Sequence, residues 1–507
     1  MLKQNARVMP KYFQGGAALL VFLTIVLLGG AYLLVSALKT STQQVRKDQQ
    51  TARALAQAKE GLLAFATLYP EQHNDMPVGF LPCPDADGDG SAELVCGLKG
   101  QSVIGRLPWR TLKLPPLRDG AGECLWYAVS GTYKYNPQWE LNSDTDGLFL
   151  VKSRDVSIEI GADTASRAIA IIFAPGQTIN NQNRSATEAQ RTECGSTVGG
   201  DGVNQAGNYL DSLAGIDNAQ GTDSGAAAGE PGSVPISAIP AMLASVFVHA
   251  PSVVANAKVV FNDALVAITP DDYRKVFARM DHWVAQRVAG CLEKYGDFND
   301  GLFPWQSSMS ATPDYFDDED TCYGRIANAI GSGGVNNLQG LANTQDSNSD
   351  MAQRWEDYPG AGRCFYEAGV NADDWWWWAG WKDKVFVAVD PNFAPAGSGD
   401  DNDLISQLEL DGTPQEGVVM VAGRRLPGQN RAAGTAAIAD YLEGDNATWS
   451  DYRFSTSPAG GGPFNDVVLG FNSAAGGMAG GMMGGASCTG CTCGMCNCGG
   501  GMGGMDD

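Results

Sequence analysis

The hydrophobic pattern of the chain opens with one uncharged apolar stretch, Gly15 to Leu38, in which Tyr32 is the only ionisable side chain. A helix needs roughly 20 apolar residues to cross the ~30 Å hydrocarbon core of a bilayer, whereas the apolar region of a cleavable signal peptide has only ~7–15. The pattern therefore predicts a transmembrane helix over residues 15–38, preceded by a cytoplasmic leader over residues 1–14.

Two later segments have the periodicity of amphipathic helices. The apolar positions of the first are Leu55, Ala58, Leu62, Phe65, Ala66 and Tyr69. The second starts at Thr269 and Pro270, an N-cap residue and a proline at the first helical position. Its apolar positions are Val276, Met280, Val284, Val288 and Leu292. Residues 39–53 have no apolar stripe, so we expect a solvated helical stalk there.

Four strand-like segments occur twice in the same order, which indicates an internal duplication. The matching pairs are Leu125–Gly131 with Val385–Asp390, Ile171–Gln177 followed by Asn183-Arg184 with Val418–Arg431, Asn208–Ala219 with Asp440–Ala447, and Phe261–Ile268 with Phe464–Phe471. Coincidence among common strand patterns is the alternative, because short apolar runs are unspecific. A helix laid across an antiparallel sheet is the α+β arrangement.

The predicted fold class is therefore α+β. A transmembrane helix continues into a second helical segment, and two tandem helix-plus-antiparallel-sheet lobes and a disordered tail follow. The predicted boundaries are 39–268 for the stalk and first lobe, 269–475 for the second lobe and 476–507 for the tail.

The chain has 57 acidic and 34 basic residues and a net charge of -23. Nucleic-acid binding needs a basic face, so nucleic acid is not expected as a partner. The charge suits a body outside the cytoplasm, and scattered cysteines in an exported protein indicate disulfides. Cys83 and Cys96 form the favoured pair because they would close a short loop.

The N-terminal segment Gln14–Leu28 resembles the prepilin signal of minor members of the type IV pilin and type II secretion pseudopilin superfamily. Residues Gly105–Gly131 are similar to a run in bacterial prepilin-like proteins. The resemblance implies cleavage after Gly15 or Gly16 and a pilin-like helix that packs into a membrane-rooted fibre. Major pilins have a glutamate at the fifth mature position, where this chain has Leu20 or Val21, which argues against a bulk fibre subunit.

An acidic loop is the first candidate metal site. Asp85, Asp87 and Asp89 alternate with Ala86 and glycines, which is the opening of a calcium loop, and Glu93 would add an oxygen. The twelfth loop position, a glutamate in such loops, is Cys96. A solvated Asp-Gly turn is the alternative interpretation. The segment Ser143–Gly147, also rich in Asp, is interpreted only as a turn.

The tail is the second candidate metal site, for Zn²⁺ or Cu(I). It is nearly all Gly, Met and Cys, and its thiols have soft-metal spacing. These cysteines are Cys488, Cys491, Cys493, Cys496 and Cys498. An oxidised or cross-linked tail is the alternative, since an oxidising compartment opposes free thiolates.

No enzymatic signature is present in the sequence, so we expect a protein that is not an enzyme. The run Trp375–Trp378 indicates either two-sided burial or a patch that faces a partner. The sequence favours a non-catalytic minor component or accessory of a type IV pilus or type II secretion system, anchored in the bacterial inner membrane with its body in the periplasm or outside the cell. Its partners would be the membrane and other pilin-like or secretion subunits. The alternative is an extracytoplasmic metal-binding protein that acts through its tail.

Overall fold

The structure is a computed structural model of the full chain. It describes residues 15–72, 78–179, 182–184, 194, 205–238, 243–298, 301–303, 306–307, 322–326, 378–393, 407–431, 437–448, 451–457 and 463–474. Within helix α1, side chains are described for residues 20–29 and 42–69.

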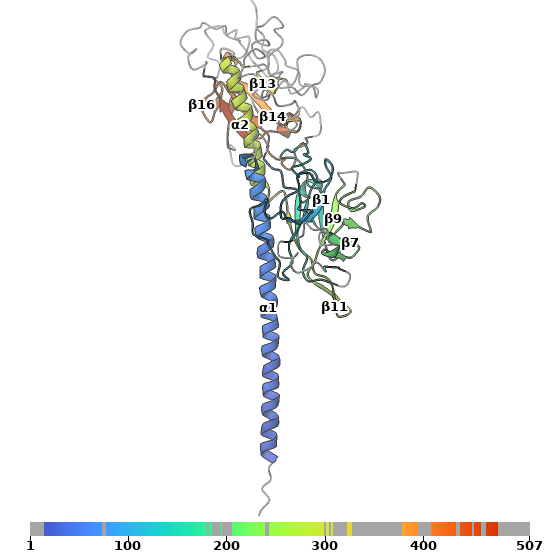
Figure 1. Cartoon of the computed structure of the whole chain (residues 1–507). Coiled ribbons are helices and arrows are strands. Elements are labelled where there is room, and N and C mark those ends of the chain that lie inside the picture. The colour runs from blue at the N-terminus through green and yellow to red at the C-terminus, as the bar shows by residue number, and fades with distance from the viewer. Residues whose placement is uncertain are drawn as a thin grey trace, which may run out of the picture.

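Helix α1 (Gly15–Gln72) is one continuous helix of 58 residues, about 87 Å long at 1.5 Å per residue. Figure 1 shows that its N-terminal half extends bare from the rest of the molecule, while its C-terminal half lies against the first lobe. The exposure of the side chains changes along the helix in the same way. Leu55, Ala58 and Leu62 are buried, whereas Leu20 to Leu28 are exposed. We call the N-terminal part of α1, residues 20–50, the stem; its C-terminal end reaches the first lobe, where Gln50 Nε2 donates to the Asp119 carbonyl at 2.9 Å.

The first lobe is built on a four-stranded antiparallel sheet that α1 covers. Its strands, in spatial order, are β1 (Val103–Arg106), β2 (Trp126–Val129), β5 (Ala170–Ala174) and β12 (Ala264–Ile268). Alternate residues of β5 face opposite sides, so Ile172 packs toward α1 while Ile171 and Phe173 pack in a second core. Both faces are buried, which explains the unbroken apolar run of β5.

A second sheet covers the other face of this lobe, and small hairpins complete it. The second sheet has the order β4 (Ile158–Ile160), β3 (Phe149–Ser153) and β9 (Ser245–His249), with β3 and β9 parallel. The remaining strands are β6 (Ser212–Leu213), β7 (Ile216–Asp217), β8 (Thr222–Asp223), β10 (Val253–Ala255) and β11 (Lys258–Phe261). Phe149, Phe173 and Phe247 pack edge to face between the two sheets.

The second lobe repeats the first four-stranded sheet around helix α2 (Arg274–Phe298), which lies beyond the C-terminal end of α1 (Figure 1). Its strands, in spatial order, are β13 (Tyr323–Arg325), β14 (Val385–Val389), β17 (Gly417–Val421) and β19 (Val467–Phe471). A smaller sheet contains β16 (Thr413–Pro414), β15 (Glu409–Leu410) and β18 (Arg453–Phe454). The short helix α4 (Trp378–Trp381) precedes β14.

The segments that match in the sequence occupy equivalent strands. Strands β2 and β14 contain the first matched pair, β5 and β17 the second, and β12 and β19 the fourth. The two Gly-Arg pairs end β1 and β13, where Arg106 and Arg325 stack on Trp126 and Phe386. Helices α1 and α2 and both sheets contribute to one continuous core, in which Tyr133 meets Tyr273 edge to face.

The predicted transmembrane helix over residues 15–38 is wrong. Among the residues that the structure describes, no helix is long and apolar enough to cross a membrane. From Thr42 onward the described side chains of the stem are mostly polar. The description of the chain as a transmembrane protein rested on this helix and is wrong with it.

The predicted fold class is corrected accordingly. The described part of the chain contains nineteen strands, arranged as six small and largely antiparallel sheets, and three α-helices. The prediction placed too much weight on helical periodicity and too little on short strands. Hairpins such as β6–β7–β8 have two-residue strands, too short for a period-two pattern to show.

The two lobes are joined by a buried ion cluster centred on Asp144 of the first lobe. Its carboxylate lies 3.0 Å from Lys384 Nζ and 2.9 Å from an Arg431 nitrogen, and it accepts a 2.6 Å bond from the Arg425 backbone N–H. Burial raises the pKa of Asp144, but the charges of Lys384 and Arg431 more than offset this and hold the pKa below its ordinary value.

The neighbouring residues tighten this joint. Lys384 Nζ also donates to Ser143 Oγ at 2.6 Å and to the Gly423 carbonyl at 3.1 Å. Arg424 donates to the carbonyls of Ser143 and Ala165 at 2.9 and 2.8 Å. The segment Ser143–Gly147, which the sequence presents only as an Asp-rich turn, therefore anchors the second lobe to the first.

We predict that Asp144→Ala destabilises the chain by about 3–5 kcal/mol, because it leaves two buried cations without their anion. The free energy of unfolding from denaturant titration measures this. Glu140→Ala is the control: it removes the exposed Lys99–Glu140 pair, whose side chains are 52% and 49% exposed, and should change stability by less than ~1 kcal/mol.

The lowered pKa of Asp144 determines the direction in which the stability of the chain changes with pH. Its contribution is complete above the unfolded pKa of about 4 and is lost as the pH falls below it. Wild type and Asp144→Ala should therefore converge in stability on acidification. Equal losses in Asp144→Ala and Glu140→Ala at neutral pH would contradict this description of the joint.

Candidate functional site

The acidic loop lies in the first lobe and is closed by a disulfide between Cys83 and Cys96, whose Cα atoms are 5.8 Å apart. Oxygen atoms of Asp85, Asp87 and Asp89 lie within 4.8 Å of one another. Asp85 is buried at 1% exposure, whereas Asp87 is exposed. The structure thus brings together three of the four carboxylates that the sequence nominates.

Backbone hydrogen bonds already hold these carboxylates. Asp85 Oδ1 accepts from Gly88 N at 2.6 Å and Oδ2 from Gly90 N at 2.8 Å. Burial raises the pKa of Asp85 to about 6, although these two hydrogen bonds oppose the shift. Gly88 and Gly90 both have a positive φ, and a Cβ at Gly90 would lie 2.6 Å from the Trp109 ring. The glycines therefore impose the turn that brings the carboxylates together.

The fourth carboxylate, Glu93, is not part of this group. Its Oε1 accepts from the backbone N–H of Ala86, between Asp85 and Asp87, at 3.1 Å. Calcium takes 6–8 oxygen ligands, and three carboxylates supply part of that number. The loop can offer a cation an anionic surface, and its backbone is already fixed by hydrogen bonds.

The same loop presents an apolar patch, defined here as Leu94, Val95 and Leu98, which are 81%, 62% and 54% exposed. The backbone beneath the patch is tightly bonded. Asn136 Nδ2 donates to the Leu94 carbonyl and Lys134 Nζ to the Leu98 carbonyl, both at 2.6 Å. Exposed apolar groups on a fixed backbone are typical of contact surfaces. No periodic pattern in the sequence predicts this patch.

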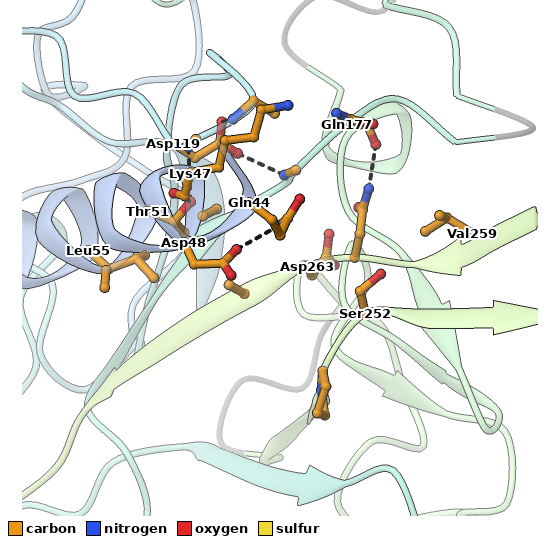
Figure 2. Close-up of a pocket in the computed structure, with 18 of the residues that line it drawn as sticks. Gln44, Lys47, Asp48, Thr51, Leu55, Asp119, Gln177, Ser252, Val259 and Asp263 are labelled. Carbon is orange, nitrogen blue, oxygen red and sulfur yellow. Dashed lines mark hydrogen bonds between the residues drawn. The ribbon is translucent and has the colours of Figure 1, made fainter. Parts of the chain in front are cut away.

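A cleft of about 530 Å³ separates the stem from the first lobe (Figure 2). Figure 2 shows Gln44, Lys47, Asp48 and Thr51 on the helix side and Gln177, Ser252, Val259 and Asp263 opposite. Several of its polar groups bond to one another: Gln44 donates to Asp48 at 2.8 Å and Gly120 N to Thr51 at 2.9 Å. Cations, anions and amides are mixed on its walls, and we assign it no ligand.

Other residues nominated from the sequence are placed as follows. Gly15 and Gly16 form the first residues of α1. The tail cysteines Cys488, Cys491, Cys493, Cys496 and Cys498, and residues 375–377 of the tryptophan run, lie outside the described residues. Trp381 is buried at 1% exposure beneath the second lobe. A second disulfide joins Cys124 to Cys194.

The duplicated segments contain polar residues whose shared buried contacts sequence reasoning missed. Arg184 and Arg431, each the last residue of a Gln-Asn-Arg triplet, have side chains that are 1% and 4% exposed, and the acids Asp263 and Asp466 are buried in equivalent positions. The repeated Phe-Asn-Asp motif at Phe261 and Phe464 was a usable signal, because polar residues preserved between two divergent copies indicate a shared polar contact.

No family model, curated protein or solved structure matches this chain. Its site is therefore interpreted from its own geometry.

We predict that Asp85→Ala destabilises the first lobe by about 2–4 kcal/mol, because two glycine N–H groups lose their acceptor and each unsatisfied buried donor costs about 1–3 kcal/mol. Thermal and denaturant unfolding measure this. Asp87→Ala, at an exposed position of the same loop, should stay within about 0.5 kcal/mol of wild type.

Calcium distinguishes the two interpretations of the loop. A site filled at a hundred times its Kd adds about 2.7 kcal/mol of stability. A calcium-dependent increase in the unfolding midpoint of wild type that Asp87→Ala lacks would identify a cation site. An unchanged midpoint in both would identify an Asp-Gly turn.

Proposed function

We propose that the chain is a non-catalytic assembly subunit, a minor pilin- or pseudopilin-like component or accessory of a type IV pilus or type II secretion system. The supporting observation is the stem, which projects from the lobes and is apolar on every side over Leu20–Leu28 (Figure 1). The sequence resemblance of this segment to prepilin signals motivates the choice of assembly.

The exposure of the stem is the physical argument. A surface helix normally has one apolar stripe and one polar face. Here Leu20, Leu23 and Val26 are 64%, 54% and 55% exposed, and Phe22, Ile25 and Leu28 on the other sides are exposed as well. Burying an apolar side chain of this size is worth about 1.5–3 kcal/mol, so leaving the whole segment in water is costly. Helices of other subunits packed around the stem would remove that cost.

The remaining features suit a rigid head on such a stem. The two lobes share one core and are locked together at Asp144, so a partner bound to either lobe would be held in a fixed relation to the stem. The apolar patch at Leu94, Val95 and Leu98 offers the head a contact surface of its own. The disulfides Cys83–Cys96 and Cys124–Cys194 suit an oxidising compartment outside the cytoplasm.

We predict that Val26→Lys lowers the amount of the chain that co-isolates with pilin-like subunits of its cell by at least about tenfold. Burying an unpaired ammonium costs several kcal/mol, and 1.4 kcal/mol already corresponds to tenfold in affinity. Co-sedimentation of the full chain with the assembled complex is the measurement.

Gln49→Lys is the matched control, because it adds the same charge at an exposed polar position of the same stem. It should leave co-isolation unchanged. Both variants should keep the Cys83–Cys96 disulfide and the unfolding midpoint of wild type, which separates assembly from folding. Wild-type co-isolation of Val26→Lys would overturn the proposal.

A further inference from the structure

Each lobe contains the same buried polar cluster, built from a glutamine, an arginine, an asparagine and two acids. In the first lobe these residues are Gln182, Arg184, Asp211, Asn218 and Asp263. In the second lobe they are Gln429, Arg431, Glu443, Asn446 and Asp466. We call them the carboxyl-pair clusters.

The arginine of each cluster binds backbone carbonyls. Arg184 donates to the carbonyls of Gly176, Asn208 and Tyr209 at 2.8, 2.9 and 2.9 Å. Arg431 donates to those of Gly423, Asp440 and Tyr441 at 2.6, 2.7 and 2.9 Å. The guanidinium thus fixes the loop that contains the first acid of the pair, and its N–H groups are largely occupied by carbonyls.

The second acid of the first lobe is bonded on one side only. Asp263 Oδ2 accepts from Asp211 N at 2.7 Å and from Asn218 Nδ2 at 3.0 Å. Asp263 is 2% exposed, and its other oxygen, Oδ1, has no hydrogen-bond partner among the described residues. Both oxygens of the Asp211 carboxylate accept a hydrogen bond: Oδ1 from Gln182 Nε2 and Oδ2 from Asn262 N, both at 2.7 Å.

The second lobe repeats this arrangement bond for bond. Asp466 Oδ2 accepts from Glu443 N at 2.8 Å and from Asn446 Nδ2 at 3.3 Å, and its Oδ1 is again buried without a partner among the described residues. Glu443 accepts from Asn465 N at 3.0 Å and from Gln429 Nε2 at 2.7 Å.

A carboxylate with one buried, unbonded oxygen beside a second carboxylate is unfavourable, since burial and like charge both disfavour ionisation. A proton on that oxygen removes both penalties, because it turns an unsatisfied acceptor into a donor toward the neighbouring acid. The same pattern in two lobes that diverged in sequence argues against an accident of packing.

We propose that each lobe has a buried proton-binding site that stabilises it. Asp263 and Asp211 share one proton in the first lobe, and Asp466 and Glu443 share one in the second. The proton is the ligand, and its loss at higher pH leaves two adjacent carboxylates in the core. The clusters therefore make the stability of the lobes depend on pH.

The pKa shifts agree with this geometry. Burial, followed by the charge of Asp211, raises the pKa of Asp263 well above its ordinary value. Burial raises the pKa of Asp211 to about 6, and burial with the charge of Glu443 raises that of Asp466 to about 8. Each pair titrates as a unit, so these directions belong to the pair.

The surrounding charged groups do not neutralise the carboxylates of the two pairs. In the first lobe Arg184 faces the pair but also lies 3.4 Å from Glu123, and Asp119 accepts from Gly176 N nearby. In the second lobe Arg431 is bound to Asp144, which also pairs with Lys384. Each arginine is thus shared with an acid outside its pair.

The pH dependence has a definite sign. Each raised pKa gives stability that is complete below the unfolded pKa of about 4 and is lost as the pH rises through the folded pKa. For one proton, the unfolding constant increases about tenfold per pH unit in that window. Between pH 5 and pH 7 each site should therefore contribute up to a ~100-fold increase.

The test is denaturant unfolding of the full chain at pH 5, 6 and 7 for wild type, Asp466→Asn and Asp263→Asn. The amide oxygen keeps the two accepted bonds and the amide N–H replaces the shared proton. Each variant should therefore lack most of the ~100-fold increase in the unfolding constant that its own site contributes between pH 5 and pH 7. Asp445→Asn, an exposed acid of the second lobe, should keep the wild-type dependence.

An unchanged pH dependence in both Asn variants would overturn the proposal. If a variant fails to fold, infrared spectroscopy of the wild-type chain decides. A protonated-carboxyl band that persists at pH 7 and disappears at higher pH supports the shared protons. A spectrum with ionised carboxylates only at pH 7 contradicts them.

Discussion

The structure depends on burying a four-stranded sheet on both faces, twice. In the first lobe α1 covers one face and the β4–β3–β9 sheet the other, so β2 and β5 are apolar throughout. The second lobe does the same with α2 and the smaller sheet at β15. Because both helices contribute to one core, the lobes form a single rigid head, and the polar contacts between them have to be buried and paired.

That constraint explains where the ionisable groups lie. Asp144 faces two cations at the joint between the lobes and remains ionised, whereas Asp263 and Asp466 each face another acid inside a lobe. Acidification below about pH 4 therefore weakens the joint, and a rise in pH above about 4 weakens the carboxyl pairs. Opposite responses of this kind place maximum stability between the two limits, as is general for proteins with buried titratable groups.

Much of the strand pattern could be predicted from the sequence, because the repeat contains long apolar runs such as Ile171–Ala174 and Val418–Val421. The helix that follows Thr269 was also readable from its periodicity, although α2 begins at Arg274 and not at Pro270. The transmembrane helix was not a correct inference. The two-residue strands are below the length at which alternation is visible, and the joint at Asp144 was read as a turn because its partners Lys384 and Arg431 are distant in the sequence. Of the site, the clustering of Asp85, Asp87 and Asp89 follows from local spacing, while the position of Glu93 depends on the fold of the loop.

The central claim is that other subunits surround the stem. Single cysteines placed at Leu20, Leu23 and Val26, with Gln49→Cys as the exposed reference, test it directly in the assembled complex. The account predicts that the first three resist a water-soluble thiol reagent and form disulfide cross-links to cysteines in the helices of pilin-like subunits, while the reference thiol is labelled. Equal labelling at all four positions, or protection without any cross-link to such a helix, would contradict it.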